Sequence, residues 1–368
     1  VVPGAVDVRP ATRDMRVLAW LRTAHGTSQW TTSVCTGAII LGHAGVLQGL
    51  EATTHWAALA QLRKVGAEPL PERSRPGAKG TSMRTTTRLR QMLQAPGIIA
   101  APGAYDGFSA HLIEAAGFPA VYMTGAGTAA SHLGMPDLGL ATLTEMANHA
   151  RHLATAISVP LIADADTGYG NALNVVRTVR EYERAGAAAL HLEDQVAPKK
   201  CGHIAGKQVI AAREFAEKIR AAAEHRSDPD FVIIARTDAR AVTSLDDAIE
   251  RGNLYREAGA DLIFVEAPQT DDEIRRVARE VKAPLLSNMV QGGKTPSMKF
   301  SELERLGYKV VIYPALCMVA AIQAMEVALG RLKERETDWH DGAMLSPLDV
   351  LRKVGFDHWS GIEQKYRA

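Results

Sequence analysis

The amino-acid sequence predicts an α/β protein whose main domain is a (β/α)8 barrel. From Met83 onward, short β-branched or apolar runs alternate with longer amphipathic segments, which is typical of parallel strands connected by helices. Eight such runs occur, which is the number of strands in this barrel. The chain has 368 residues, more than the roughly 100–200 of an average domain, so we expect a second, smaller unit before the barrel.

The eight expected strands are separated by segments with helical periodicity, such as Ala211–Ala223 and Asp271–Val281. Two others, Leu173–Gly186 and Leu245–Gly259, end at a glycine, which suits a helix C-cap. A doubly wound sheet would normally carry a glycine-rich phosphate turn after its first strand, and the sequence has none there. The expected strands are Ile98–Ala101, Ala120–Thr124, Pro160–Ala165, Ala189–Glu193, Phe231–Arg236, Leu262–Glu266, Pro284–Asn288 and Lys309–Tyr313.

Four segments are expected along the chain. The stretch EPLPERSRPGAKGTSMRTTT concentrates Pro, Gly, Ser and Arg without apolar periodicity, so residues 71–86 are interpreted as a linker. The linker separates an N-terminal α/β segment, residues 1–70, from the barrel, residues 87–335. A C-terminal helical tail, residues 336–368, is expected after the barrel because residues 346–366 are amphipathic.

Composition excludes several classes of partner. Lys and Arg total 42 and Asp and Glu total 41, so the chain has no global basic field for nucleic acid or an anionic membrane. The most apolar run, residues 34–47, is shorter than the roughly 20 residues that span a bilayer. Three cysteines are typical of a reducing compartment, and residues 1–13 lack the pattern of a secretory signal. We therefore expect a cytoplasmic protein with a small-molecule partner.

Polar residues occur at the carboxyl ends of all eight runs, where barrel enzymes place their catalytic groups. Any one of them could instead cap a loop or form a surface ion pair. Asp164, Asp166 and Glu193 follow neighbouring strands and would bring hard oxygen ligands together, which suits Mg2+ or Mn2+. Asp137, in the loop after the second strand, could join them. The other polar strand ends are Tyr105, Asp106, Thr124, Gly125, Asp194, residues 236–238, Glu266, Asn288 and Tyr313.

The loop after the fourth strand, EDQVAPKKCGHIAGK, contains the most specific feature of the sequence. Lys199, Lys200 and His203 lie within four positions of Cys201. Nearby cations lower the pKa of a thiol and make the sulfur useful for proton transfer or nucleophilic attack. Cys317, by contrast, lies in the apolar stretch ALCMVAAI and is expected in the core. The spacing of Cys201 and His203, without a second Cys or His pair, does not fit a zinc site.

From Met83 onward the chain resembles the isocitrate lyase and phosphoenolpyruvate mutase superfamily. The match runs in order through APGAYDG, YMTGAG, GMPDLGL, ADADTGYG, HLEDQ, PKKCGH, IARTDA, FVEAP and SNMVQGG. KKCGH is typical of the carbon–carbon lyases of that superfamily. The short chain and FVEAP make it most similar to the 2-methylisocitrate and 2,3-dimethylmalate lyases. The resemblance implies the barrel of that superfamily with C-terminal helices, and a homotetramer that could exchange a C-terminal helix between subunits.

The same resemblance implies roles for single residues. Cys201 would donate a proton to the enediolate-like fragment that forms when the carbon–carbon bond breaks, and Arg236 would stabilise its negative oxygen. Magnesium or manganese would be held, directly or through water, by Asp164, Asp166, Glu193 and Asp137. The further catalytic residues implied are Lys199, His203 and Glu266. The substrate-binding residues implied are Tyr122, Thr124, Gly125, Ala126, Asp164, Gly202, His203, Arg236 and Asn288.

The expected activity is Mg2+-dependent cleavage of a 2-hydroxy di- or tricarboxylic acid, such as 2-methylisocitrate or 2,3-dimethylmalate, to pyruvate and a second carboxylic acid. Oxaloacetate decarboxylase and carboxyphosphonoenolpyruvate phosphonomutase activities stay open on the same scaffold. A pseudoenzyme or non-catalytic binding module is the alternative from another class. Thr124, Gly125 and Ala126 stand where many of these lyases carry Ser followed by glycines, and Lys294 lies where specificity for the second fragment would be decided.

Before the linker, TTSVCTGAIILGHAGVLQGLEATTHWAAL resembles the core of the DJ-1/PfpI family. In that family a Cys lies on a tight strand-to-helix turn and a His follows downstream. Cys35 and His55 occupy these positions. The resemblance covers only the middle of such a domain, without its opening strands or its closing half. We therefore expect a fused remnant here and not a second active site.

Overall fold

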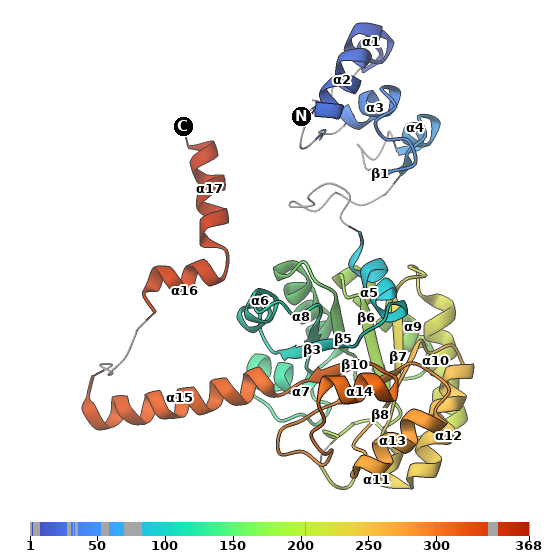
Figure 1. The fold of residues 1–368 in the computed structure, drawn as a ribbon, viewed down its shortest axis with the longest axis vertical. Coiled ribbons are helices and arrows are strands. Elements are labelled where there is room, and N and C mark those ends of the chain that lie inside the picture. The colour runs from blue at the N-terminus through green and yellow to red at the C-terminus, as the bar shows by residue number, and fades with distance from the viewer. Residues whose placement is uncertain are drawn as a thin grey trace. The chain divides into compact units, whose positions relative to one another are not determined.

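The computed structural model describes residues 2, 8–27, 31, 33, 36–52, 59–69, 83–202, 204–337 and 345–367. Two compact units divide the chain, Val1–Met83 and Arg84–Ala368. The second unit contains the barrel and the C-terminal helices (Figure 1).

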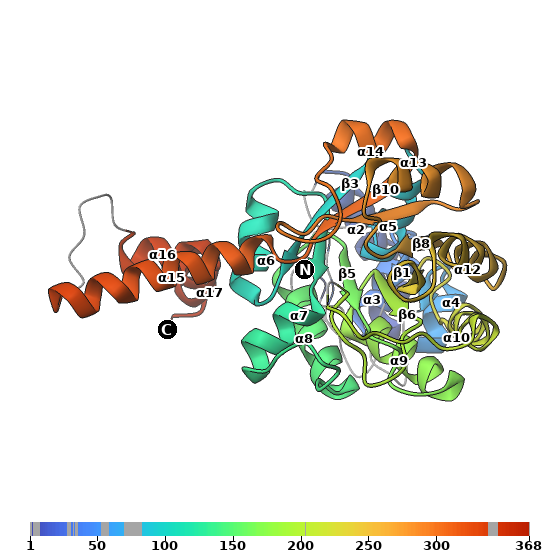
Figure 2. The same cartoon turned by 90° about the horizontal axis from the view of Figure 1, so that it is seen from below.

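Eight parallel strands close into a barrel, which confirms the predicted (β/α)8 architecture. Each strand pairs with the next along the chain, and the last pairs with the first. Helices surround the ring of strands (Figure 2). The strands are β3 (Ile99–Ala104), β4 (Val121–Met123), β5 (Leu161–Asp164), β6 (Ala189–Glu193), β7 (Val232–Thr237), β8 (Leu262–Val265), β9 (Leu285–Asn288) and β10 (Tyr308–Tyr313).

Helix α9 (Ala172–Ala185) illustrates why the sequence forms the surrounding helices. The Asn171 side chain accepts hydrogen bonds from two amides of the first turn. Val175, Val179 and Tyr182 lie on one face and are fully buried. Gly186 ends the helix in the left-handed region, at φ 89°, as predicted. The other helices of this unit before the last strand are α5 (Thr85–Gln94), α6 (Gly107–Ala115), α7 (Gly125–Thr128), the π-helix η2 (Ala129–Leu133), α8 (Leu143–Ala156), α10 (Ala212–His225), α11 (Ala239–Val242), α12 (Leu245–Glu257), α13 (Asp271–Glu280) and α14 (Phe300–Leu306).

The first barrel strand is longer than the sequence pattern predicts. β3 continues to Ala104 instead of ending at Ala101, and so includes Pro102 and Gly103. A Cβ atom at Gly103 would lie 2.2 Å from the carbonyl oxygen of Pro314, so only glycine permits this close approach of two backbones. Gly103 and Pro314 are far apart in the sequence, so apolar periodicity does not predict their contact or the longer strand.

The N-terminal unit is small. Its buried side chains include Leu18, Leu21, Ile40 and Leu41, which pack together. Cys35 and His55 lie outside the described residues, so the structure does not bear on their predicted arrangement. The elements of this unit are α1 (Arg9–Arg13), α2 (Met15–Thr27), α3 (Gly37–His43), α4 (Leu59–Lys64) and the parallel two-residue strands β1 (Glu51–Ala52) and β2 (Glu68–Pro69).

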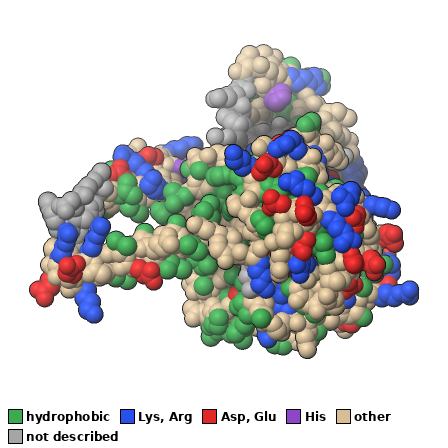
Figure 3. Space-filling model, turned by 60° about the horizontal axis from the view of Figure 1, so that its bottom comes forward, with side chains coloured by type: hydrophobic (Ala, Val, Ile, Leu, Met, Phe, Trp, Pro, Cys, Tyr) green, Lys and Arg blue, Asp and Glu red, His purple; other side chains and the backbone are tan. Residues whose placement is uncertain are grey.

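The C-terminal segment forms three helices, α15 (Leu316–Arg335), α16 (Pro347–Lys353) and α17 (Phe356–Tyr366). Helix α15 extends away from the barrel in both ribbon views (Figures 1 and 2), and none of its 20 residues is buried. Hydrophobic side chains gather along the C-terminal helices in the space-filling view (Figure 3). Among the described helices, none combines the length and the hydropathy that a membrane-spanning helix requires.

The buried carboxylate of Asp194 joins the carboxyl ends of β6 and β7. It accepts hydrogen bonds at 2.8–3.1 Å from Thr237 Oγ1, Tyr255 Oη, Arg251 Nη1 and the Asp238 amide. These bonds fix the strand ends that carry Glu193 and Arg236. Removing the carboxylate would leave several buried donors without an acceptor.

We predict that Asp194→Ala lowers the free energy of unfolding of the barrel by about 3–5 kcal/mol, because a buried ion pair loses one partner. Urea unfolding followed by tyrosine difference absorbance measures this, since every tyrosine except Tyr366 lies between residues 105 and 313. Asp272→Ala, at an exposed position in α13, is the matched control and should cost less than about 1 kcal/mol. Equal losses in the two variants would contradict the role of Asp194.

Candidate active site

Alternation of side chains along the strands directs the strand-end residues into the mouth of the barrel. In β7, Val232 and Ile234 pack inside the barrel, whereas Ile233 and Ala235 belong to the layer between strands and helices. Arg236 follows Ile234 by two residues and therefore faces inward. The same alternation applies to Thr124, Asp164, Glu193, Glu266 and Asn288.

All of these side chains except Glu193 line a cavity of about 90 Å3 at the carboxyl end of the barrel. Phe264, Val290 and Met318 also line it, although the sequence did not indicate them. The predicted site residues that line it are Tyr122, Thr124, Ala126, Asp137, Asp164, Lys199, Cys201, Gly202, Arg236, Glu266 and Asn288. Three further ones, Gly125, Asp166 and Glu193, contact these lining residues. His203 lies outside the described residues.

Asp164 is held by groups from neighbouring strands. Its Oδ2 accepts a hydrogen bond from the Gly125 amide at 3.1 Å, and its Oδ1 accepts one from the Asp166 amide at 3.0 Å. A Cβ atom at Gly125 would lie 2.3 Å from Asp164 Oδ2, which explains the glycine. Burial opposes ionisation of Asp164, but its polar neighbours, His191 first, outweigh this and lower its pKa to about 2. Asp164 is therefore a carboxylate in the folded protein.

Lys199 links two of the predicted metal ligands. Its Nζ lies 2.9 Å from Asp166 Oδ1 and 2.5 Å from Asp137 Oδ1. Asp166 itself lies in the left-handed region of backbone conformation, at φ 45°, which is uncommon for a residue with a Cβ atom. Burial, opposed by Lys199, raises the pKa of Asp166 to about 6. Asp166 is thus an acidic residue in a buried position that disfavours its charged form.

Arg236 is surrounded by carboxylates. Its Nε lies 3.1 Å from Glu193 Oε2 and donates to Asp238 Oδ2 at 2.8 Å, and its Nη2 lies 3.6 Å from Glu266 Oε2. Asn288 Nδ2 donates to Glu266 Oε2 at 3.1 Å. Burial raises the pKa of Glu193 well above its ordinary value, although Arg236 acts against this shift. Arg236 thus links three carboxylates from three strands.

Cys201 is partly exposed and lines the same cavity as Arg236. The Cys201 amide donates to the Asp137 carbonyl at 3.2 Å, which attaches the Cys201 backbone to the loop after β4. Gly202 lies directly against Arg236, because a Cβ atom at Gly202 would be 2.5 Å from Arg236 Nη2. Cys317 does not lie in the core as expected: it is half-buried and packs against the core from outside, because it lies at the start of α15, none of whose residues is buried.

Carboxylates outnumber cations around the cavity, which bears on whether a metal ion fits. Six acidic side chains lie with three basic ones around the cavity among the described residues, so a divalent cation would offset charge that burial disfavours on groups such as Asp166 and Glu193. No three His, Cys, Asp or Glu side chains in the described ranges converge closely enough to hold an ion by themselves. Mg2+ fits such a site, because it is usually bound by one or two carboxylates together with water. The six are Asp137, Asp164, Asp166, Glu193, Asp238 and Glu266, and the cations are Lys199, Lys207 and Arg236.

Three buried residues that support the site were missed from the sequence. His191 Nε2 lies 2.7 Å from the Tyr122 hydroxyl and 3.5 Å from Asp164 Oδ1. Gln195 Nε2 donates to Glu193 Oε1 at 2.9 Å, and Lys207 contacts the loop that carries Cys201. Alternation along β6 would have identified His191, two residues before Glu193. Nothing in the sequence spacing indicates the other two.

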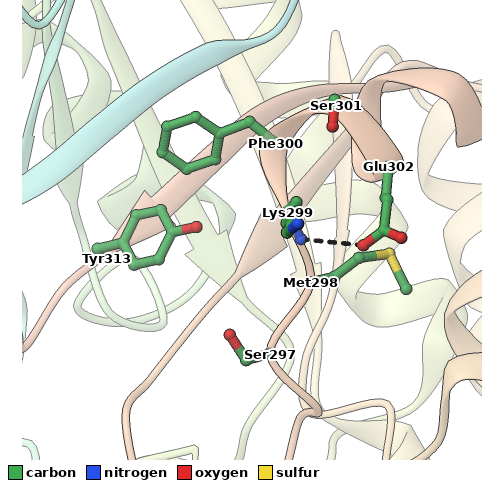
Figure 4. Close-up of a pocket in the computed structure, with 7 residues that line it drawn as sticks. All are labelled: Ser297, Met298, Lys299, Phe300, Ser301, Glu302 and Tyr313. Atoms are coloured by element: carbon green, nitrogen blue, oxygen red, sulfur yellow. Dashed lines mark hydrogen bonds between the residues drawn. The ribbon is translucent and has the colours of Figure 1, made fainter.

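A second, larger hollow of about 720 Å3 lies beside the end of β10 and the start of α14 (Figure 4). The rings of Phe300 and Tyr313 pack edge to face with their centroids 5.6 Å apart, and the Lys299 amide donates to Glu302 Oε2 at 3.3 Å. Its charged residues are exposed to solvent. Because it contains none of the strand-end carboxylates, we assign the chemistry to the smaller cavity.

We predict that His191 makes stability depend on pH. Burial lowers its pKa to about 4, so the folded protein keeps it neutral while the unfolded chain takes up a proton near pH 6.5. Its contribution is complete above pH 6.5 and is lost as the pH falls toward 4. Between about pH 7.5 and pH 5, wild type should lose about 2 kcal/mol more than His191→Gln in urea unfolding. The exposed His225→Gln should behave as wild type, and equal pH slopes in all three proteins would contradict the prediction.

Comparison with known proteins identifies both units. A model of the phosphoenolpyruvate phosphomutase family matches residues 89–333, and a model of the DJ-1/PfpI family matches residues 1–87. The 2,3-dimethylmalate lyase of Eubacterium barkeri is 50% identical over 255 residues, which cover 69% of this chain and 88% of that protein. The 2-methylisocitrate lyase of Aeropyrum pernix is 49% identical over 249 residues, which cover 68% and 80%. Both resemblances predicted from the sequence are confirmed.

Solved structures agree with this assignment. A crystal structure of 2,3-dimethylmalate lyase, described as a PEP mutase/isocitrate lyase superfamily member, has a TM-score of 0.75 and 39% identity and covers 78% of this chain and 97% of that one. A phosphonopyruvate hydrolase in complex with oxalate and Mg2+ has a TM-score of 0.71 and 32% identity, and covers 78% and 100%. The chain therefore belongs to the phosphoenolpyruvate phosphomutase family, within the PEP mutase/isocitrate lyase superfamily.

Proposed function

We propose that this protein is a Mg2+-dependent carbon–carbon lyase that cleaves a 2-hydroxy di- or tricarboxylic acid to pyruvate and a second carboxylic acid. The observation that carries the proposal is the position of Cys201 on a cavity that also contains Arg236 and the strand-end carboxylates. The names of the two lyase relatives indicate substrates of this kind, 2,3-dimethylmalate and 2-methylisocitrate.

Opposite walls of the cavity would bind the two fragments. Thr124, Gly125 and Ala126, at the end of β4 and the start of α7, would bind the carboxylate of the pyruvate fragment. Glu266 and Asn288, at the ends of β8 and β9, would bind the second fragment. The cavity is lined by residues from both groups, which supports this division.

Negative charge develops on the oxygen atoms of the departing fragment when the carbon–carbon bond breaks. Burial acts to lower the pKa of Arg236, but its carboxylate neighbours, Asp238 first, raise it well above the ordinary value. Arg236 therefore stays charged and would stabilise the developing negative charge. As the carbon–carbon bond breaks, the substrate hydroxyl loses its proton to water and its oxygen becomes the carbonyl oxygen of pyruvate. Cys201 would transfer its thiol proton to the carbon of the other fragment, and the thiolate would then regain a proton from water, so no proton is gained or lost overall.

Mg2+ or Mn2+ would be held by Asp164, Asp166, Glu193 and Asp137, directly or through water, and would supply a Lewis acid for the substrate oxygens. The surplus of carboxylates around the cavity supports this assignment, as does the Mg2+ complex of the similar phosphonopyruvate hydrolase. Lys199 would keep Asp137 and Asp166 in position and offset part of their charge.

We predict that the purified protein releases pyruvate from 2-methylisocitrate or 2,3-dimethylmalate with Mg2+ and that a chelator abolishes the release. Cys201→Ser should reduce kcat by about 100- to 10,000-fold, because a general acid is lost. Citramalate, isocitrate and oxaloacetate complete the substrate panel. Pyruvate release is measured with a coupled assay that consumes pyruvate.

Cys317→Ser is the control for Cys201→Ser, because Cys317 packs against the core and should be replaceable without loss of kcat. Product from oxaloacetate alone that survives Cys201→Ser would replace the lyase with a decarboxylase. No cleavage of any substrate, together with no binding of oxalate in the presence of Mg2+, would favour a non-catalytic protein.

We also propose a homotetramer in which α15 packs against a neighbouring subunit. Apolar side chains on α15 are unusually exposed, including Met325 at 54%, Val327 at 53% and Leu329 at 65%. An exposed apolar surface of this extent is typical of a contact with another protein. Hydrophobic side chains along the C-terminal helices in Figure 3 agree with this interpretation.

Sedimentation velocity at micromolar concentration should therefore show a tetramer, and Leu329→Glu should shift the protein to smaller species. The reason is that a charge buried in an apolar contact costs several kcal/mol when it has no partner. Leu173→Glu is the matched control, because Leu173 is a comparably exposed leucine on α9, at 79%. A monomer in wild type, or a tetramer that tolerates Leu329→Glu, would overturn the proposal.

A further inference from the structure

Lys207 is a buried cation that the proposed reaction does not use. Its side chain is 2% exposed, and its Nζ donates to the Gly202 carbonyl oxygen and to Asp238 Oδ1, each at 2.6 Å. Gly202 directly follows Cys201. One ammonium group therefore connects the backbone beside the proposed proton donor with a carboxylate at the end of β7.

Asp238 also binds the guanidinium of Arg236. Asp238 Oδ2 accepts from Arg236 Nε at 2.8 Å, and Oδ1 accepts from Arg236 Nη2 at 3.1 Å. The Asp238 amide donates to the buried carboxylate of Asp194, which fixes the Asp238 backbone. Lys207 and Arg236 thus share the Oδ1 atom of a fully buried carboxylate.

Gly202 lies so close to Arg236 and Glu266 that a residue with a Cβ atom would not fit without a shift. A Cβ atom there would lie 2.5 Å from Arg236 Nη2 and 2.8 Å from Glu266 Cδ. The Gly202 carbonyl accepts the hydrogen bond from Lys207. Gly202 is thus hydrogen-bonded by Lys207 and lies close against Arg236 and Glu266, and the adjacent Cys201 is held with it.

We propose that Lys207 is a positioning residue, which holds the Gly202 carbonyl, and with it Cys201, against Arg236 through the shared Asp238 carboxylate. The inference rests on the proposed roles of Cys201 and Arg236. It adds that the proton donor and the charge-stabilising group are positioned by the same carboxylate. A shift of about 1 Å at either group is enough to cost about 100-fold in rate.

The test compares wild type with Lys207→Met in the full chain. Cys201 should react with iodoacetamide at least about 10-fold faster in Lys207→Met, and kcat should fall about 10- to 100-fold with little change in KM. Losing a nearby cation would by itself reduce the thiolate fraction and slow alkylation, so acceleration reports that Cys201 has lost its position. Peptide mass spectrometry gives the rate at Cys201, with Cys317 in the same molecule as a reference that should not change.

Two further variants complete the test. Gly202→Ala keeps the ion pair of Lys207 with Asp238 but pushes residue 202 away from Arg236, so it should also accelerate alkylation of Cys201. If Lys207→Met does not fold, which urea unfolding would reveal, the alkylation rate of Gly202→Ala tests the inference instead. Lys309→Met removes a solvent-exposed hydrogen bond from Lys309 Nζ to the Ala95 carbonyl. This variant should match wild type in both the alkylation rate and kcat.

Unchanged alkylation of Cys201 in Lys207→Met and Gly202→Ala would overturn the inference, even if kcat fell. Faster alkylation with an unchanged kcat would also overturn it, because positioning would then have no effect on the reaction. If wild type cleaves none of the substrates, the proposed function fails. The alkylation rates would still decide whether Lys207 positions Cys201.

Discussion

The alternation of side chains along a closed parallel barrel is the constraint on which this site depends. Every second residue of each strand faces the interior. Beyond the packed core, the next inward-facing residue of a strand therefore lies at the carboxyl end of the barrel, where the cavity is. Asp164, Glu193, Arg236, Glu266 and Asn288 occupy such positions. The same packing that stabilises the barrel therefore brings these five polar side chains from five strands together at one cavity, which all but Glu193 line.

Charge is the second property of the site. Burying several carboxylates in one place is unfavourable, and the raised pKa values of Asp166 and Glu193 reflect this cost. Lys199 and Arg236 offset part of it through ion pairs that also set the geometry of the carboxylates. Acidic side chains still outnumber basic ones around the described cavity, which favours a divalent cation at the mouth of the barrel.

A chain of buried contacts links the stability of the fold to the chemistry. Asp194 holds the ends of β6 and β7 together, and the amide that it binds belongs to Asp238. Asp238 in turn binds Arg236 and Lys207, and Lys207 binds the backbone next to Cys201. Each member is buried, so each depends on its partner to remain charged or hydrogen-bonded. Substitutions in this chain should therefore affect both stability and activity.

The sequence by itself determined the eight strands, their order and the carboxylates at their ends, because strand periodicity and composition are local properties. It also indicated Cys201 as the distinctive residue, through the cations beside it. Only the tertiary structure decided that β3 extends to Ala104, that Gln195 binds Glu193, and that Lys207 reaches Gly202 and Asp238. These features arise from contacts between residues that the folded chain brings together, and no sequence period encodes the direction of a loop side chain.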